Sequence, residues 1–139
     1  MTKSRLAILA ATLITVASLS ACKADHSAFP TLTVDQLSTL LDGDNDVTVL
    51  DANSSGVRDE YGKIPGAVLL TSYGSYDLAA ELPSSKDSSL VFYCSSEMCS
   101  AAPKAAERAV DAGYEEVFVL PVGIKGWVKS GKAVENVSG

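Results

Sequence analysis

Two cysteines, Cys94 and Cys99, stand in a segment whose pattern favours thiol chemistry. The residues from Leu90 to Tyr93 form a short apolar run typical of a buried strand. Residues 100–112 are rich in Ala, Lys, Glu and Arg, which favour a helix. Cys94 is therefore expected at the carboxyl end of a strand, facing backbone amides that have no helical partner and lower a thiol pKa below about 8.5. This placement suits a nucleophilic thiol, and a buried, inert cysteine at the end of a core strand is the alternative.

Strand patterns and helix patterns alternate along the chain. We expect strands over residues 47–50, 67–70, 90–93 and 117–120, and helices or helical stretches over 33–41, 58–60, 76–82, 100–112 and 124–129. The first helix begins with a capping box from Thr33 to Gln36, and Trp127 on the last helix is expected in the core. Such alternation predicts an α/β domain with a parallel sheet covered on both faces, and ligands of such sheets bind at the carboxyl ends of the strands, where Cys94 falls.

Several segments also resemble those of a single-domain rhodanese, and they occur in the order of that family. They are Val49-Leu50-Asp51, Tyr61-Gly62-Lys63-Ile64-Pro65-Gly66-Ala67, the Cys94 loop, Ala112-Gly113-Tyr114 and Gly123-Ile124-Lys125-Gly126-Trp127. The resemblance covers about residues 31–135. It implies a three-layer fold with a central parallel sheet of about five strands, and it places the rhodanese-like domain at residues 31–139.

The resemblance implies sulfur transfer by Cys94. In a rhodanese the thiolate takes a sulfane sulfur from a donor such as thiosulfate, holds it as a persulfide and passes it to an acceptor thiol or cyanide. The partners implied are a sulfane-sulfur donor and a thiol acceptor, each a small molecule or a protein, with no cofactor and no metal. The expected substrate-binding loop consists of Ser95, Ser96, Glu97, Met98 and Ser100.

The active-site loop departs from the family pattern. The family usually has Arg five positions after the cysteine and often Gly two positions before that Arg, whereas this chain has Cys99 and Glu97 there. Loss of the Arg removes a cation that would hold thiosulfate, and an inward-facing Glu97 would raise the pKa of the Cys94 thiol. A small anionic donor is therefore disfavoured.

Charged and polar residues also follow the first core strand. Asp51 is interpreted as structural, with its carboxylate accepting hydrogen bonds from loop amides, and a catalytic acid is the alternative. Asn53 stands where many family members carry Arg. Arg58 and Lys63 are expected to be solvated surface charges rather than substitutes for the missing cation.

Cys99 changes the expected chemistry. A curled loop would bring the Cα atoms of Cys94 and Cys99 within the range of about 4.4–6.8 Å that a disulfide requires. Cys99 would then be a resolving thiol that discharges a persulfide or mixed disulfide on Cys94. Alternatives are a dithiol–disulfide oxidoreductase, a pair of thiols that bind a soft metal ion or arsenite, and a catalytically silent binding module locked by a structural disulfide.

The N-terminal segment has the plan of a signal peptide. Lys3 and Arg5 precede an apolar run, and the tetrapeptide ending at Cys22 resembles a bacterial lipobox. We expect a lipoprotein signal peptide at residues 1–21 and a tether at 22–30 that is lipidated at Cys22, with a cleaved, non-lipidated signal peptide as the alternative. The protein is then expected in the bacterial cell envelope, lipid-anchored and facing the periplasm, with Lys23 favouring the outer membrane.

Charge excludes one class of partner. Removal of residues 1–21 takes away Lys3 and Arg5, so nine of the 11 basic residues remain against 17 acidic ones, a net charge of about −8. Nucleic acid is therefore not an expected partner. The single histidine, His26, lies in the tether, so a Cys–His catalytic pair and a His-ligated zinc site are not expected in the domain.

Overall fold

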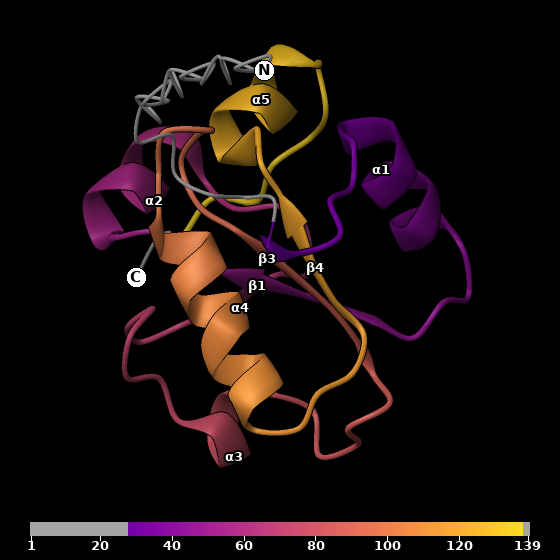
Figure 1. Ribbon diagram of the computed structural model, residues 1–139. Coiled ribbons are helices and arrows are strands. Elements are labelled where there is room, and N and C mark those ends of the chain that lie inside the picture. The colour runs from indigo at the N-terminus through magenta and orange to yellow at the C-terminus, as the bar shows by residue number, and fades with distance from the viewer. Residues whose placement is uncertain (1–27, 138–139) are drawn as a thin grey trace, which may run out of the picture.

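The computed structural model describes residues 28–137 (Figure 1). Within them the chain forms α1 (Val34–Asp42), β1 (Val47–Asp51), α2 (Ser55–Tyr61), β2 (Val68–Leu69), α3 (Leu78–Glu81), β3 (Ser89–Tyr93), α4 (Ala101–Asp111), β4 (Val117–Leu120) and α5 (Gly123–Lys129). None of the helices in this range is long and apolar enough to cross a membrane. The expected signal peptide, the lipidated Cys22 and most of the tether lie outside the described residues.

The four strands form one parallel sheet in the order β2-β1-β3-β4. Asp51 of β1 pairs with Tyr93 of β3, which in turn pairs with Leu120 of β4, so the carboxyl ends of these strands lie level. Thr31 adds a single parallel bridge beside Val119 of β4. The predicted α/β fold with a central parallel sheet is confirmed, and the expected number of about five strands is approximate.

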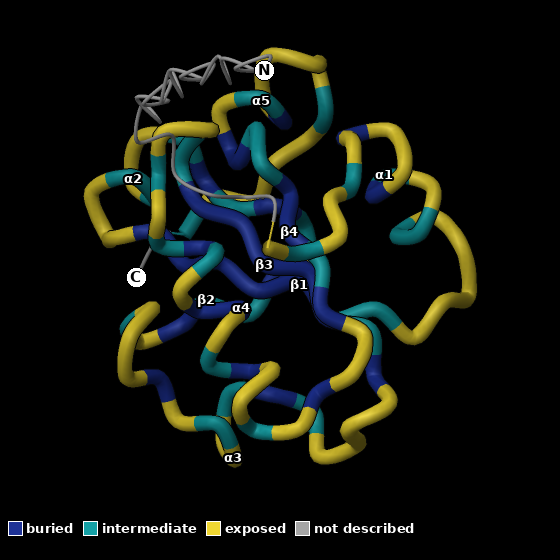
Figure 2. The backbone as a smooth tube through the Cα atoms, in the orientation of Figure 1, coloured by how far each residue is buried: buried dark blue, intermediate teal, exposed yellow. Residues whose placement is uncertain are grey.

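The central strand β3 is buried over almost its whole length (Figure 2). Alternate strand residues pack into two apolar clusters, one on each face of the sheet. On one face Leu50, Leu90, Phe92 and Val119 pack with the alanines of α4, which are Ala102, Ala105, Ala106 and Ala109. On the other face Val49, Val91, Tyr93 and Leu120 pack with residues of α1 and α5, among them Leu37, Ile124 and Trp127. The indole is 3% exposed, which confirms its expected place in the core.

Helix boundaries follow local hydrogen bonds. The Thr33–Gln36 capping box is formed at the start of α1, as expected. The helical stretch expected from Tyr76 to Leu82 is shorter, because the Asp77 carboxylate accepts hydrogen bonds from the amides of Ala79 and Ala80 and starts α3 at Leu78. Tyr76 instead lies in the core, where its hydroxyl donates to the Ala105 carbonyl over 2.8 Å.

The small residues Ala105, Ala106 and Ala109 form the buried face of α4, whereas Val110 is 45% exposed. Val110 directly follows Ala109 and therefore points about 100° away from it on the helix, toward solvent.

Glu81 fastens the segment between β2 and α3. Its carboxylate accepts hydrogen bonds from the Thr71 amide and hydroxyl, each at 2.8 Å, and from the Asp77 amide at 2.9 Å. Burial raises the pKa of Glu81, but these hydrogen bonds outweigh it, so the pKa lies below its ordinary value of 4.5. A carboxyl with a depressed folded-state pKa contributes stability that is present above its unfolded pKa and is lost as the pH falls through the folded value.

Glu81→Gln should therefore destabilise the domain at neutral pH and matter less in acid. A loss of about 1 kcal/mol would lower the melting temperature by about 4 °C in a domain of this size. Thermal unfolding of both proteins from pH 7 to pH 3 should show the difference narrowing as the pH falls below 4.5. A difference that stays constant over this range would contradict the assigned role of the ionised carboxylate.

Candidate active site

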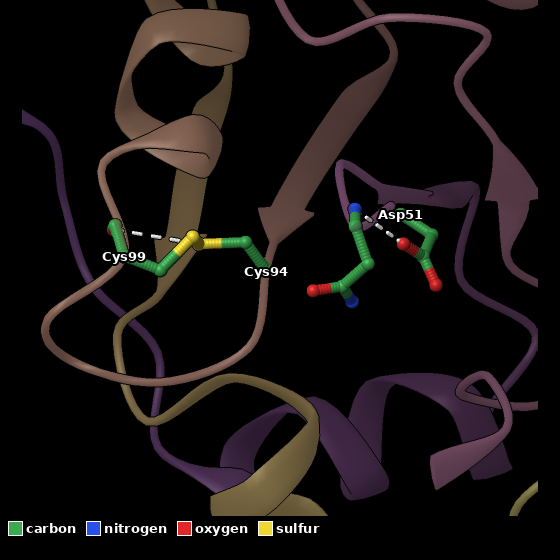
Figure 3. Close-up of a disulfide and its surroundings, with 4 residues drawn as sticks. Asp51, Cys94 and Cys99 are labelled. Atoms are coloured by element: carbon green, nitrogen blue, oxygen red, sulfur yellow. Dashed lines mark hydrogen bonds between the residues drawn. A yellow bond between two sulfur atoms is a disulfide. The ribbon is translucent and has the colours of Figure 1, made fainter. Parts of the chain in front are cut away.

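Cys94 directly follows the last residue of β3, at the carboxyl end of a central strand (Figure 3). It is 2% exposed and belongs to the apolar cluster on the α4 face of the sheet. The structure thus places this side chain at the edge of the sheet where parallel α/β folds bind ligands.

Cys94 and Cys99 form a disulfide, with their Cα atoms 6.3 Å apart. The loop curls back because the Cys99 amide donates to the Ser96 carbonyl over 3.0 Å and closes a tight turn. Cys99 then leads into α4, which begins at Ala101 with Ser100 as its N-cap residue. Pro103 fits there because the amides of the first helical turn have no intrahelical partner.

The start of α5 holds the other side of the loop. The amides of Ile124 and Lys125 donate to the carbonyls of Cys94 and Ser95, at 2.9 and 3.1 Å. Gly123 permits this close approach, because a Cβ atom there would lie 2.7 Å from the carbonyl carbon of Ser95, and its φ of +59° is one that L side chains rarely adopt. Backbone hydrogen bonds from α5 therefore hold the start of the loop, in addition to the disulfide that joins its two ends.

This arrangement also sets the direction of the loop amides. In a trans peptide the C=O of one residue and the N–H of the next point in opposite directions. Since the carbonyls of Cys94 and Ser95 face α5, the amides of Ser95 and Ser96 point away from it, toward the side of the sheet on which Cys94 packs. Within the described residues these two amides have no backbone partner, so they can meet negative charge on the Cys94 sulfur.

The Cys94 sulfur lies 3.4 Å from the carbonyl oxygen of Cys99. A sulfur in a disulfide carries no proton, so it can donate a hydrogen bond to this carbonyl only after reduction to the thiol. The loop therefore offers the Cys99 carbonyl as an acceptor for the thiol and the amides of Ser95 and Ser96 as donors for the thiolate.

The remaining loop residues lie at different depths. Ser95 and Ser96 are partly buried, whereas Glu97, Met98 and Ser100 are exposed. Glu97 is therefore exposed in this conformation and does not face inward. Met98 is 92% exposed, next to Cys99.

Asp51 is fully buried at the end of β1, on the opposite face of the sheet from the disulfide (Figure 3). Its carboxylate accepts hydrogen bonds from the Asn53 amide at 2.7 Å, the Tyr93 hydroxyl at 2.6 Å and Arg58 Nε at 3.3 Å. Burial, together with the charge of Asp51 and the hydrogen bond to it, raises the pKa of Tyr93, so its hydroxyl stays a donor.

The expectation that Arg58 and Lys63 are solvated surface charges is wrong. Arg58 forms an ion pair with Asp51 and also donates to the carbonyls of Asp51 and Leu70, each at 3.0 Å. Lys63 pairs with Glu135 at 3.2 Å and donates to the Ala67 carbonyl at 2.9 Å. Both cations are already engaged by anionic or carbonyl oxygens, so neither replaces the missing loop Arg.

Asn53, at the position where many rhodaneses carry Arg, is 8% exposed. Its side-chain Nδ2 has no hydrogen-bond partner within the described part of the chain. Its backbone amide donates to Asp51, so the residue is tied to the structural network by its main chain.

Comparison with protein families identifies the domain. The sequence model of the rhodanese-like domain family matches residues 33–130. The chain belongs to this family. The match includes Asp51, the turn at Pro65-Gly66, both loop cysteines and the segment from Gly123 to Trp127, which carried the resemblance in the sequence.

Solved structures show the same rhodanese fold. The BH2092 protein of Bacillus halodurans has a TM-score of 0.67 and 24% identity, and the match covers 79% of each chain. The thiosulfate sulfurtransferase of Pseudomonas aeruginosa has a TM-score of 0.68 and 21% identity over 84% of this chain and 22% of that one. The single-domain sulfurtransferase RDL2 of Saccharomyces cerevisiae has a TM-score of 0.60 and 24% identity over 73% of this chain and 90% of that one. No curated protein matched the sequence.

Two features of the rhodanese-like site were missed in the sequence. One is Arg58 as the partner of Asp51, seven residues apart across the β1–α2 connection. The other is Gly123 with the two amides that follow it. A glycine between a strand pattern and a helix pattern was the available signal, but it does not say which backbone segment lies against it.

Gly123→Ala should displace the Cys94 loop, because the added methyl group would overlap the backbone of Ser95 and Ser96. Gly131→Ala is the matched control, since Gly131 also has a positive φ, +75°, but no atom lies within 4 Å of its added Cβ. The control should show only backbone strain of about 1–2 kcal/mol. Urea unfolding should show a larger loss for Gly123→Ala, and sulfur loading of the reduced protein should be slowed in that variant alone. Equal effects of the two substitutions in both assays would contradict the role of Gly123 in fixing the loop.

Proposed function

We propose that this rhodanese-like protein is a thiol sulfurtransferase or persulfide carrier with Cys94 as its nucleophile and Cys99 as its resolving thiol. The observation that carries the proposal is the position of Cys94, at the end of a central strand. It lies beside the amides of Ser95 and Ser96, which point away from α5. Membership in the rhodanese-like family and the fold shared with a thiosulfate sulfurtransferase support a sulfurtransferase-type role.

The proposed loading step is a displacement at sulfur. The Cys94 thiolate attacks the sulfane sulfur of the donor, a new S–S bond forms, and the bond between the two donor sulfurs breaks with its electron pair on the leaving group. With thiosulfate the leaving group is sulfite, and the product is the Cys94 persulfide anion. Its charge falls on the terminal sulfur, which the loop amides can meet.

A dithiol–disulfide oxidoreductase is the second candidate, and the Cys94–Cys99 disulfide favours it. In that case the pair would exchange electrons with thiols but would not accept sulfane sulfur. The same disulfide is also compatible with a catalytically silent binding module in which the loop is permanently locked. Sulfur loading of the reduced protein separates the proposed function from both alternatives.

Cys94→Ser should abolish sulfur loading from thiosulfate or polysulfide, because a serine hydroxyl is hardly ionised at neutral pH. Cys99→Ser should still load and should accumulate the persulfide, because no neighbouring thiol remains to discharge it. Mass spectrometry of the intact, pre-reduced proteins after exposure to donor should show one added sulfur atom in Cys99→Ser and none in Cys94→Ser.

The reduced wild type without donor is the control for this measurement. Loading that is lost in Cys99→Ser and kept in Cys94→Ser would reverse the assignment of the two cysteines. A reduced wild type that loads sulfur from neither donor would refute the sulfurtransferase proposal.

The proposal includes a location at the bacterial cell envelope through a lipid on Cys22, facing the periplasm. It rests on the sequence, because Cys22 directly follows the small residues that end the apolar run. An extended chain from Cys22 to Phe29 spans at most about 28 Å, so such a tether would keep the domain close to the membrane surface. The order of residues after Cys22 favours the outer membrane.

Cys22→Ser should release the protein from membranes, because it removes the thiol that carries the lipid. Fractionation of cells that express the wild type or the variant should show the wild type in the membrane pellet and the variant in the soluble envelope fraction. Cys99→Ser, which leaves the N-terminus intact, is the control and should stay in the pellet. Equal membrane association of Cys22→Ser and wild type would rule out the lipid anchor.

A further inference from the structure

The disulfide and the proposed nucleophile use the same sulfur. While Cys94 is bonded to Cys99 it has no thiolate with which to attack a donor, so sulfur loading requires that the disulfide be opened first. Thiol–disulfide exchange opens a disulfide at one of its two sulfurs, and access decides which one is attacked.

Access to the two sulfurs is unequal. Cys94 is 2% exposed and sits in the apolar cluster with Ala52 and Ala102. Cys99 is partly exposed, and both of its neighbours in the chain, Met98 and Ser100, are exposed. Figure 3 shows Cys94 extending from the end of β3 and Cys99 at the other end of the loop, just before α4. Cys99 also packs against this cluster, but it is only partly buried, so it is the more accessible of the two cysteines to an incoming thiolate.

The leaving groups are unequal too. Attack on Cys99 expels Cys94 as a thiolate into the space faced by the amides of Ser95 and Ser96. Attack on Cys94 would instead expel Cys99 as a thiolate. The backbone amide of Cys99 already donates to the Ser96 carbonyl, so it is not free to stabilise that thiolate. A thiol with a lower pKa leaves faster, so the electrostatics of the loop favour the same direction as access.

We infer that a dithiol reductant opens the disulfide by attacking Cys99, and that the protein thereby reduces sulfane sulfur to hydrogen sulfide. This inference rests on the proposed sulfur loading at Cys94 and names the electron donor and the product of that same site. The reductant is identified by its chemistry, two thiols that form a disulfide with each other.

The cycle balances in three steps. Cys94 thiolate takes the sulfane sulfur of thiosulfate and sulfite leaves. The Cys99 thiolate then attacks the Cys94 sulfur of the persulfide, the Cys94–Cys99 disulfide forms, and hydrosulfide leaves with the electron pair of the broken bond. Finally one thiolate of the reductant attacks Cys99 and releases Cys94 thiolate, and its second thiolate attacks the first reductant sulfur and releases Cys99. The net reaction of thiosulfate and a dithiol yields sulfite, hydrogen sulfide and the disulfide of the reductant.

The point of attack can be read directly, because Glu97 lies between the two cysteines. The oxidised full-length protein is mixed with a thioredoxin variant whose second active-site cysteine is replaced by serine, which cannot complete the exchange and stays attached. After acid quenching and alkylation of free thiols, cleavage at glutamate places Cys94 in the fragment 82–97 and Cys99 in the fragment 98–107. A parallel reaction uses 2-mercaptoethanol, so that a protein reductant and a small one are distinguished.

The adduct is expected on fragment 98–107 and the alkyl group on fragment 82–97, in at least a tenfold excess over the reverse. An adduct on fragment 98–107 from 2-mercaptoethanol and not from the thioredoxin variant supports Cys99 as the point of attack and overturns a protein as the reductant. An adduct on fragment 82–97, an even distribution, or no opening by either reagent overturns the inference. With thiosulfate and dithiothreitol, the wild type should release hydrogen sulfide continuously. In a second assay, the pre-reduced proteins receive thiosulfate but no reductant, so that each molecule reacts once. Cys99→Ser should then release at least tenfold less hydrogen sulfide than the wild type.

These experiments distinguish a failure of the proposed sulfurtransferase function from a failure of the further inference. If the reduced wild type does not load sulfur, the sulfurtransferase function is wrong, whatever the position of the trapped adduct. If it loads sulfur but the adduct lies on Cys94, or if loading proceeds without sulfide release in the presence of dithiothreitol, only the further inference is wrong.

Discussion

The buried carboxylate of Asp51 is the interaction on which the geometry of the site depends. It joins the end of β1 to α2 through Arg58 and to the last residue of β3 through the Tyr93 hydroxyl. That hydroxyl also accepts from the Ile64 amide, so the turn before β2 belongs to the same network. Removing one member of such a buried pair leaves an uncompensated charge, at a cost of about 3–5 kcal/mol. Since Cys94 is the next residue after Tyr93, the network fixes the point from which the Cys94 side chain extends.

The network and the sulfur lie on opposite faces of the sheet, and this separation shapes the chemistry. Asp51 and Tyr93 pack on the face of α1, α2 and α5, whereas Cys94 packs with α4. The negative charge of Asp51 is therefore kept away from an anionic sulfur. The potential at the sulfur comes instead from loop amides, whose direction is set by the hydrogen bonds to Ile124 and Lys125. Backbone dipoles of this kind suit a persulfide anion, because they stabilise its charge. They bind an anion less tightly than a guanidinium does.

The sequence was informative where a pattern is local and uninformative where a contact joins distant elements. The apolar runs of β1, β3 and β4, the capping box at Thr33 and the place of Cys94 after a strand follow from periodicity and short-range hydrogen bonding, and each could be predicted. The role of Arg58 could not be predicted, because its neighbours in sequence are polar and exposed and indicate a surface charge. Only the path of α2 over the end of β1 brings Arg58 to Asp51. Gly123 was passed over for the same reason, since its close contact is with a loop nearly thirty residues earlier in the chain.

The exchange of the family's loop Arg for Cys99 changes what controls the site. A guanidinium at this position would attract an anionic donor and leave the nucleophile permanently free. A thiol there gives no charge to a donor, but it can close the site by bonding to Cys94, as it does in this structure. The proposed location in the cell envelope would favour that closed state, because disulfides persist in oxidising compartments. Under the proposed function, the availability of the Cys94 thiolate would then depend on how fast a reductant reaches the partly buried Cys99, so the site would respond to the supply of thiols.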